Sequence, residues 1–202
     1  MIVATVITCP QRWTEYQRLR RNFDALKFPF SLRTFQTEEG LGSPYVNNNL
    51  NARAAIAYAA HRLASQEDGW LLYLEDDVVL TERWPAVLAE LVRIGSAENV
   101  DCWYLCNRKN EVKAQYRREG LVLNELAYPI YGGHALLVPG RHLKRILDSH
   151  WATYSDLAIF AAINHPSLKV FQVVDPVLAE HVGEFSTYAP QTKRELEINY
   201  AD

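Results

Sequence analysis

The chain has 202 residues, and a hydrophobic share of 49% against a charged share of 22% argues against a disordered or low-complexity segment. Lys and Arg number 21 and Asp and Glu 24, and the resulting formal charge of −3 argues against a protein that binds duplex DNA by charge alone. Three cysteines without a CxxC pair argue against a secreted disulfide framework or a zinc ribbon.

No targeting segment is evident at the start of the chain. Residues 1–7 lack a basic lead and a cleavage site, and no apolar run approaches the roughly 18 residues needed to cross a bilayer. No linker rich in Pro, Gly or Ser divides the chain. We therefore expect one soluble domain in a reducing, cytoplasmic location.

The first elements alternate between strand and helix. Residues 2–8 form a nearly unbroken β-favouring run, typical of a strand covered on both faces, and residues 32–36 predict a second strand. Between them, Tyr16, Leu19 and Phe23 form the apolar stripe of a helix. A second helix is predicted from residue 47, with its buried face made of Leu50, Ala54, Ala57, His61 and Ala64.

The alternation continues through the second half. Residues 70–74 predict a central strand, and Thr81 is a candidate cap for the helix that follows. Further strands are predicted at residues 101–106, 121–126, 131–138 and 169–174. Helices are predicted after Gly140 and after Ser155. The pattern predicts an α/β sandwich, with a mostly parallel central sheet flanked by helices.

Three carboxylates, Glu75, Asp76 and Asp77, follow the predicted central strand directly. Ligands of open α/β sheets bind outside the carboxyl ends of strands. Adjacent carboxylates raise one another's pKa unless a cation or hydrogen-bond donors neutralise them, and oxygen ligands favour Mg²⁺ or Mn²⁺. The cluster predicts a divalent cation site; the alternative is a solvated acidic turn.

Two segments resemble a known family. Leu74-Glu75-Asp76-Asp77-Val78 resembles the acidic DxD-type motif of GT-A glycosyltransferases, and residues 176–186, which contain His181, resemble their C-terminal metal-binding histidine segment. Both stretches are similar to those of branching N-acetylglucosaminyltransferases and lipopolysaccharide-type glycosyltransferases. The resemblance implies a GT-A fold and a nucleotide-sugar donor.

The resemblance also implies roles for single residues. Asp77 and His181 would ligate the metal, while Glu75 and Asp76 would face the nucleoside ribose and the metal's waters. Residues 6–12 lie where such enzymes begin their nucleotide-binding strand, which implies that Thr8 and Arg12 bind the donor. A guanidinium at a strand-to-helix turn can bind phosphates in a bidentate way; the alternative for Arg12 is an ordinary surface arginine.

Asp156 is the candidate general base. It follows Ser155 at a predicted helix start, which matches the position of the acceptor-facing acid in inverting GT-A enzymes. The alternative is that Asp156 only complements the helix dipole. Asp148 and Asp175 are weaker candidates.

Two glycines interrupt the strand predicted at residues 131–138. The segment of residues 131–135, with Gly132 and Gly133, resembles the loop through which the backbone approaches the donor sugar in this family. The alternative is a β-bulge without a ligand.

Basic residues in segments 107–110, 113–118 and 141–145 suit a phosphate-bearing acceptor, such as a lipid-linked sugar or a hydroxymethylated DNA base. The alternative is a set of solvated charged surfaces. A glycan is the third acceptor class that fits the resemblance.

The sequence thus predicts a metal-dependent, inverting glycosyltransferase of one domain. Residues 1–100 would form its nucleotide-sugar-binding half, residues 101–190 its acceptor-binding half, and residues 191–202 a polar tail. One alternative is a nucleotidyltransferase, although Cys9-Pro10-Gln11 lacks the glycines of a phosphate loop. The other is a catalytically silent module that binds a nucleotide or sugar.

Overall fold

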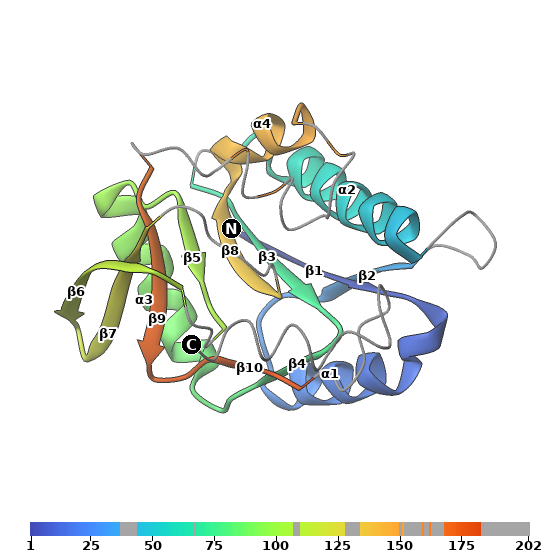
Figure 1. Ribbon diagram of the computed structural model, residues 1–202, viewed down its shortest axis with the longest axis horizontal. Helices are drawn as coiled ribbons and strands as arrows, with labels where there is room; N and C mark the ends of the chain where they lie inside the picture. The colour runs from blue at the N-terminus through green and yellow to red at the C-terminus, as the bar shows by residue number, and fades with distance from the viewer. Residues whose placement is uncertain are drawn as a thin grey trace.

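A computed structural model describes residues 1–36, 44–66, 68–106, 110–127, 134–149, 151, 159, 162 and 168–182. Its centre is an eight-stranded sheet with the strand order β2-β1-β3-β8-β5-β9-β7-β6 (Figure 1). The strands are β1 (Ile2–Thr8), β2 (Leu32–Gln36), β3 (Trp70–Glu75), β5 (Cys102–Tyr104), β6 (Val112–Arg118), β7 (Leu121–Leu126), β8 (Ala135–Pro139) and β9 (Val170–Asp175).

Most strands of this sheet run in the same direction. β1 is parallel to β2 and β3, and β5 is parallel to β9. β8 is antiparallel to both of its neighbours, and so is β7. Of the eight strands, β8 and β7 therefore run in one direction and the other six in the opposite direction. The predicted α/β fold with a mostly parallel sheet is confirmed.

Helices cover the sheet on both sides. Figure 1 shows α2 (Pro44–Leu63) and α4 (Leu143–Leu147) on one side of the central strands and α1 (Trp13–Ala25) on the other. α2 packs against β1, β2 and β3 and contacts α4, whereas α1 packs along β4 (Val78–Leu80). α3 (Trp84–Glu98) approaches β3 and β5 through Gly95. Short 3₁₀ turns, Pro10–Arg12 and Gly140–His142, lead into α1 and α4.

The core explains why the central strands read as continuous apolar runs. β3 is buried along its length except at Glu75, and all five residues of β8 are buried. Trp70, Trp84 and Trp103 are among the largest side chains that are fully buried. Burial on both faces removes the alternation that a half-exposed strand would show.

The prediction of which face of α2 is buried is wrong. Leu50 is 46% exposed, and the other four predicted residues, Ala54, Ala57, His61 and Ala64, are all exposed. The helix instead buries Ala52, Ala55, Ile56, Ala59 and Leu63. The Asn51 amide, which donates to the Thr8 carbonyl at 2.9 Å, fixes this rotation of the helix against β1.

The predicted cap of α3 also needs correction. Thr81 does not cap α3, because its hydroxyl donates to the Val177 carbonyl at 2.8 Å and Arg83 is the N-cap residue. The basic segment 113–118 lies on strand β6 at the edge of the sheet, where most of its residues are exposed, and its role toward an acceptor remains a prediction.

Several predictions lie outside the described residues or stay untested. Ser155 and the predicted helix start after it are outside that part of the chain, and so are residues 107–109 and 191–202. The division into two functional halves remains a prediction. Within the described ranges, no helix combines the length and the apolar character that crossing a membrane requires.

Candidate active site

The carboxylate triplet lies where β3 ends. Asp76 and Asp77 form the turn between β3 and β4 at the carboxyl end of the parallel strands. β4 pairs with β10 (Ala179–His181), with His181 opposite Val78. The Val182 N–H donates to the Asp77 carbonyl at 2.8 Å. This small two-stranded sheet therefore holds His181 beside Asp77, although 104 positions separate the two residues along the chain.

A second histidine reaches the same place from β8. Because β8 is antiparallel to β3, the amino end of β8 lies at the carboxyl end of β3, with Ala135 opposite Leu74. His134 precedes this strand, and its carbonyl accepts a hydrogen bond from the Glu75 N–H at 2.8 Å. Its side chain therefore lies next to the carboxylates.

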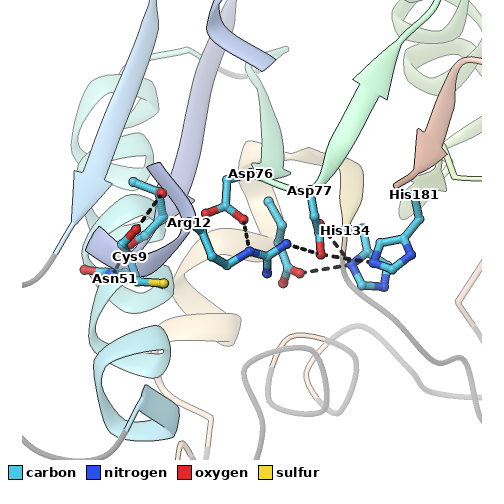
Figure 2. A network of polar contacts seen from close by, with 9 residues as sticks. Cys9, Arg12, Asn51, Asp76, Asp77, His134 and His181 are labelled. Atoms are coloured by element: carbon cyan, nitrogen blue, oxygen red, sulfur yellow. Dashed lines mark hydrogen bonds and ion pairs between the residues drawn. The ribbon is translucent and has the colours of Figure 1, made fainter. Parts of the chain in front are cut away.

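Asp77, His134 and His181 form a compact cluster (Figure 2). His181 Nε2 lies 3.0 Å from Asp77 Oδ2, and His134 Nδ1 lies 3.6 Å from Asp77 Oδ1 and 3.0 Å from Glu75 Oε2. One donor atom from each of the three lies within 4.8 Å of the others. Asp77 Oδ1 and His134 Nε2 are buried, and neither finds a hydrogen-bond partner in the described part of the chain.

Arg12 faces the same carboxylates from the 3₁₀ turn that follows β1. The 3₁₀ turn that carries it is closed by a hydrogen bond from the Arg12 N–H to the Cys9 carbonyl at 3.0 Å. Arg12 Nε lies 3.1 Å from Asp76 Oδ1, and Nη2 lies 2.6 Å from Asp77 Oδ2. Figure 2 shows the guanidinium between the two aspartates, with the imidazoles beyond Asp77.

Burial is the main influence on the pKa of Asp76. The side chain is almost wholly enclosed, and burial raises the pKa of Asp76 to about 7. The Arg12 guanidinium and a hydrogen bond from Thr8 act in the opposite direction. The neighbouring carboxylates of Asp77 and Glu75 add to the rise.

Asp77 titrates in the other direction. Burial favours its protonated form, but the adjacent imidazoles of His134 and His181 outweigh burial and hold the pKa of Asp77 well below its ordinary value. Burial also disfavours the charged form of His134 and so lowers its pKa. Contacts with Asp77 and Glu75 outweigh burial and raise the pKa of His134 to about 10. An ionised Asp77 thus faces a protonated His134, and a metal ion that binds to this imidazole must displace its proton.

Of the residues singled out from the sequence, six lie together. Thr8 ends β1 and Arg12 lies in the 3₁₀ turn after it; Glu75 ends β3, Asp76 and Asp77 follow it, and His181 lies beside Asp77. His181 is the last residue of the strand β10. Gly132, Gly133 and Asp156 are outside the described residues.

His134 belongs to this cluster, but no pattern in the sequence marked it as a ligand. Only the two glycines before it marked the segment for attention. The missing information was the direction of β8: a parallel strand would begin at the opposite edge of the sheet, far from the carboxylates.

The donor set suits a divalent transition metal. One carboxylate and two imidazoles are ligands that Mn²⁺ and its neighbours in the first row accept, whereas Mg²⁺ prefers oxygen. Asp77 Oδ1 and His134 Nε2, which are buried and have no hydrogen-bond partner among the described residues, are free to make a further interaction.

The fold is that of known glycosyltransferases. The chain aligns over 96% of its length with all of a glycosyltransferase involved in the glycosylation of the major capsid of PBCV-1, at 13% identity and a TM-score of 0.54. A segment of S. aureus TarS, residues 1–349, matches 90% of the chain at 13% identity and a TM-score of 0.53, with 60% of the segment covered. No model of a protein family and no curated protein matches the sequence.

A third similar structure carries ligands. Drosophila β-1,4-galactosyltransferase 7, in complex with manganese, UDP-Gal and xylobiose, aligns with 96% of the chain over 78% of its own length, at 13% identity and a TM-score of 0.51. At such identities the likeness establishes the fold and leaves the chemistry to the side chains of the site.

Proposed function

We propose that this protein is a metal-dependent glycosyltransferase of the GT-A type that transfers a sugar from a nucleotide-sugar donor to an acceptor hydroxyl. One observation carries the proposal: Asp77, His134 and His181 converge within 4.8 Å at the carboxyl end of β3. Their convergence at the ligand-binding edge of a glycosyltransferase fold supports a catalytic rather than a structural cluster.

Asp77, His134 and His181 would hold the cation, and the two imidazoles favour Mn²⁺ over Mg²⁺. The manganese in the complex of the Drosophila enzyme supports this choice. A divalent cation here would act as a Lewis acid and stabilise the negative charge that develops on the diphosphate leaving group.

The chain's own residues would bind the donor and activate the acceptor. The nucleotide part would be bound by Thr8, Arg12, Glu75 and Asp76, with Gly132 and Gly133 beside the sugar. Asp156 would remove the proton of the acceptor hydroxyl, because an alcohol is a poor nucleophile until it loses that proton. This chemistry inverts the anomeric centre.

The donor and the acceptor can be sought by class. UDP-sugars come first, because TarS has been solved with UDP-GlcNAc and the Drosophila enzyme with UDP-Gal. Glycans, lipid-linked sugars and DNA with hydroxymethylated bases are the acceptor classes to compare. Mass spectrometry of each acceptor detects the mass of one added sugar.

The direct test is turnover of UDP-sugars, as hydrolysis or transfer, with Mn²⁺ and with EDTA. We expect EDTA to abolish turnover and Asp77→Asn to lower it at least 100-fold, because the variant removes the anionic ligand. Asp68→Asn, at an exposed aspartate before β3, is the matched control and should keep the wild-type rate. Equal turnover by Asp77→Asn and wild type, with and without EDTA, would refute the proposal.

The role of Asp156 has its own test. Asp156→Asn should lower kcat by about 10²- to 10⁴-fold while the affinity for the donor stays unchanged, as expected for a general base. Asp68→Asn, at an exposed aspartate outside the predicted site, is the control. An unchanged kcat for Asp156→Asn would remove this residue from the mechanism.

A further inference from the structure

Arg12 is placed unusually for a residue that only binds a donor. Its side chain is 15% exposed, and its two contacts, at 3.1 and 2.6 Å, go to the carboxylates of Asp76 and Asp77. Both carboxylates are almost wholly enclosed, at 4% and 5% side-chain exposure. A buried carboxylate without a partner is strongly destabilising, so the guanidinium supplies a compensating positive charge.

The contact to Asp77 bears directly on the metal site. Asp77 Oδ2 already faces both Arg12 Nη2 and His181 Nε2, and Asp77 is the anionic member of the cluster that could hold an ion. A divalent cation on this carboxylate would bring two positive groups to one buried anion. Their repulsion is poorly screened in an enclosed site, so the guanidinium opposes binding of the metal.

We propose that Arg12 is an internal counter-ion, which neutralises Asp76 and Asp77 while no metal is bound and moves from Asp77 to the donor's diphosphate when the metal binds. This inference rests on the proposed function. It follows that metal and donor favour each other's binding, because the diphosphate accepts the guanidinium that the metal displaces.

The test measures Mn²⁺ alone, by calorimetric titration of wild type and Arg12→Gln. Removal of the competing charge should lower the Kd for Mn²⁺ about tenfold, which corresponds to about 1.4 kcal/mol. Arg20→Gln is the matched control, because Arg20 lies on α1 and pairs with Asp24 at the surface, away from the cluster. Its Kd should equal that of wild type.

A second variant covers the case in which Arg12→Gln does not fold. Arg12→Lys keeps the positive charge but loses the two-armed contact, and it should bind Mn²⁺ more tightly than wild type, by a smaller factor than Arg12→Gln. A Kd that is unchanged or raised in the folded variants overturns the counter-ion role and leaves the metal site intact. Absence of Mn²⁺ binding in wild type as well overturns the metal site, and this inference with it.

Discussion

At the scale of single residues, His134 is the decisive member of the cluster, because it was not marked as a ligand by the sequence. We predict that His134→Asn raises the Kd for Mn²⁺ by at least about 10- to 100-fold. Loss of a residue that only supports a metal ligand already has an effect of this size. The physical reason is the loss of an imidazole that lies 3.6 Å from Asp77 Oδ1. Titration with Mn²⁺, followed by the electron paramagnetic resonance of the free ion, measures the change.

The exposed His61 on α2 provides the control for this prediction. His61→Asn should bind Mn²⁺ as wild type does. Equal affinity of His134→Asn and His61→Asn would show that His134 is a structural neighbour of the carboxylates and not a ligand.

The three members of the cluster differ in how far the sequence predicted them. Asp77 follows an apolar run directly, so its place at a strand end could be inferred from the pattern. His181 was linked to it only by family resemblance, since no periodicity relates positions so far apart. His134 required the direction of β8, which depends on pairing across the sheet and leaves no local signal.

At the scale of elements, α3 depends on a glycine for its close approach to the sheet. A Cβ atom at Gly95 would lie 2.5 Å from Trp70 Cη2 and 2.9 Å from Trp103 Nε1. We predict that Gly95→Ala lowers the free energy of unfolding by about 1–3 kcal/mol, because overpacking outweighs the gain in helix propensity. Urea denaturation measures the loss. Ser96→Ala, at the next and exposed position, should not destabilise the protein.

A second element-scale prediction concerns the amino ends of β5 and β9, which lie opposite the carboxyl ends where the cluster is. Asp101 precedes β5, and its carboxylate accepts a hydrogen bond from the Lys169 N–H, just before β9, at 2.8 Å. Arg141 Nη2 and His142 Nε2 lie 3.2 and 2.7 Å from its other oxygen. Burial opposes ionisation, but these contacts outweigh it and lower the pKa of Asp101 below 3.8. Asp101→Asn should therefore cost about 1–3 kcal/mol of stability at pH 7.

The pH dependence of this loss tests its cause. Because the folded pKa is depressed, the stabilisation is complete above the ordinary value of 3.8 and is lost as the pH falls through the lower folded value. The difference in unfolding free energy between wild type and Asp101→Asn should therefore shrink below pH 3.8. Asp148→Asn, at an exposed position, should have nearly the same free energy of unfolding as wild type, both above and below pH 3.8. A gap that stays constant with pH would assign the effect to packing instead.

The orientation of α2 shows what element-scale patterns leave open. Alanines occupy both of its faces, so the helical period fits the stripe of Leu50, Ala54 and Ala57 as well as that of Ala52, Ala55 and Ile56. The contact of Asn51 with the end of β1 chooses between them, and that contact joins positions 43 residues apart. Strands β3 and β7 were predictable because burial on the sheet shapes their composition directly.

At the scale of the whole molecule, the cluster ties together segments that are distant in the sequence. Asp77 lies in the turn after β3, His134 precedes the antiparallel β8, and His181 lies on a separate two-stranded sheet. An ion bound by all three cross-links these parts, and it binds the unfolded chain weakly because the ligands are then far apart. Metal binding should therefore stabilise the entire fold and not only the site.

We predict that Mn²⁺ at 100 times its Kd stabilises the protein by about 2.7 kcal/mol, which raises Tm by about 5–10 °C in a domain of this size. Thermal unfolding with Mn²⁺, with Mg²⁺ and with EDTA measures the shift, and Mn²⁺ should exceed Mg²⁺ at equal concentration because two ligands are imidazoles. His181→Asn should lose most of the Mn²⁺ shift, whereas His61→Asn should keep it. If His181→Asn keeps the full shift, the ion binds elsewhere, and the contact between the two-stranded sheet and β3 is structural only.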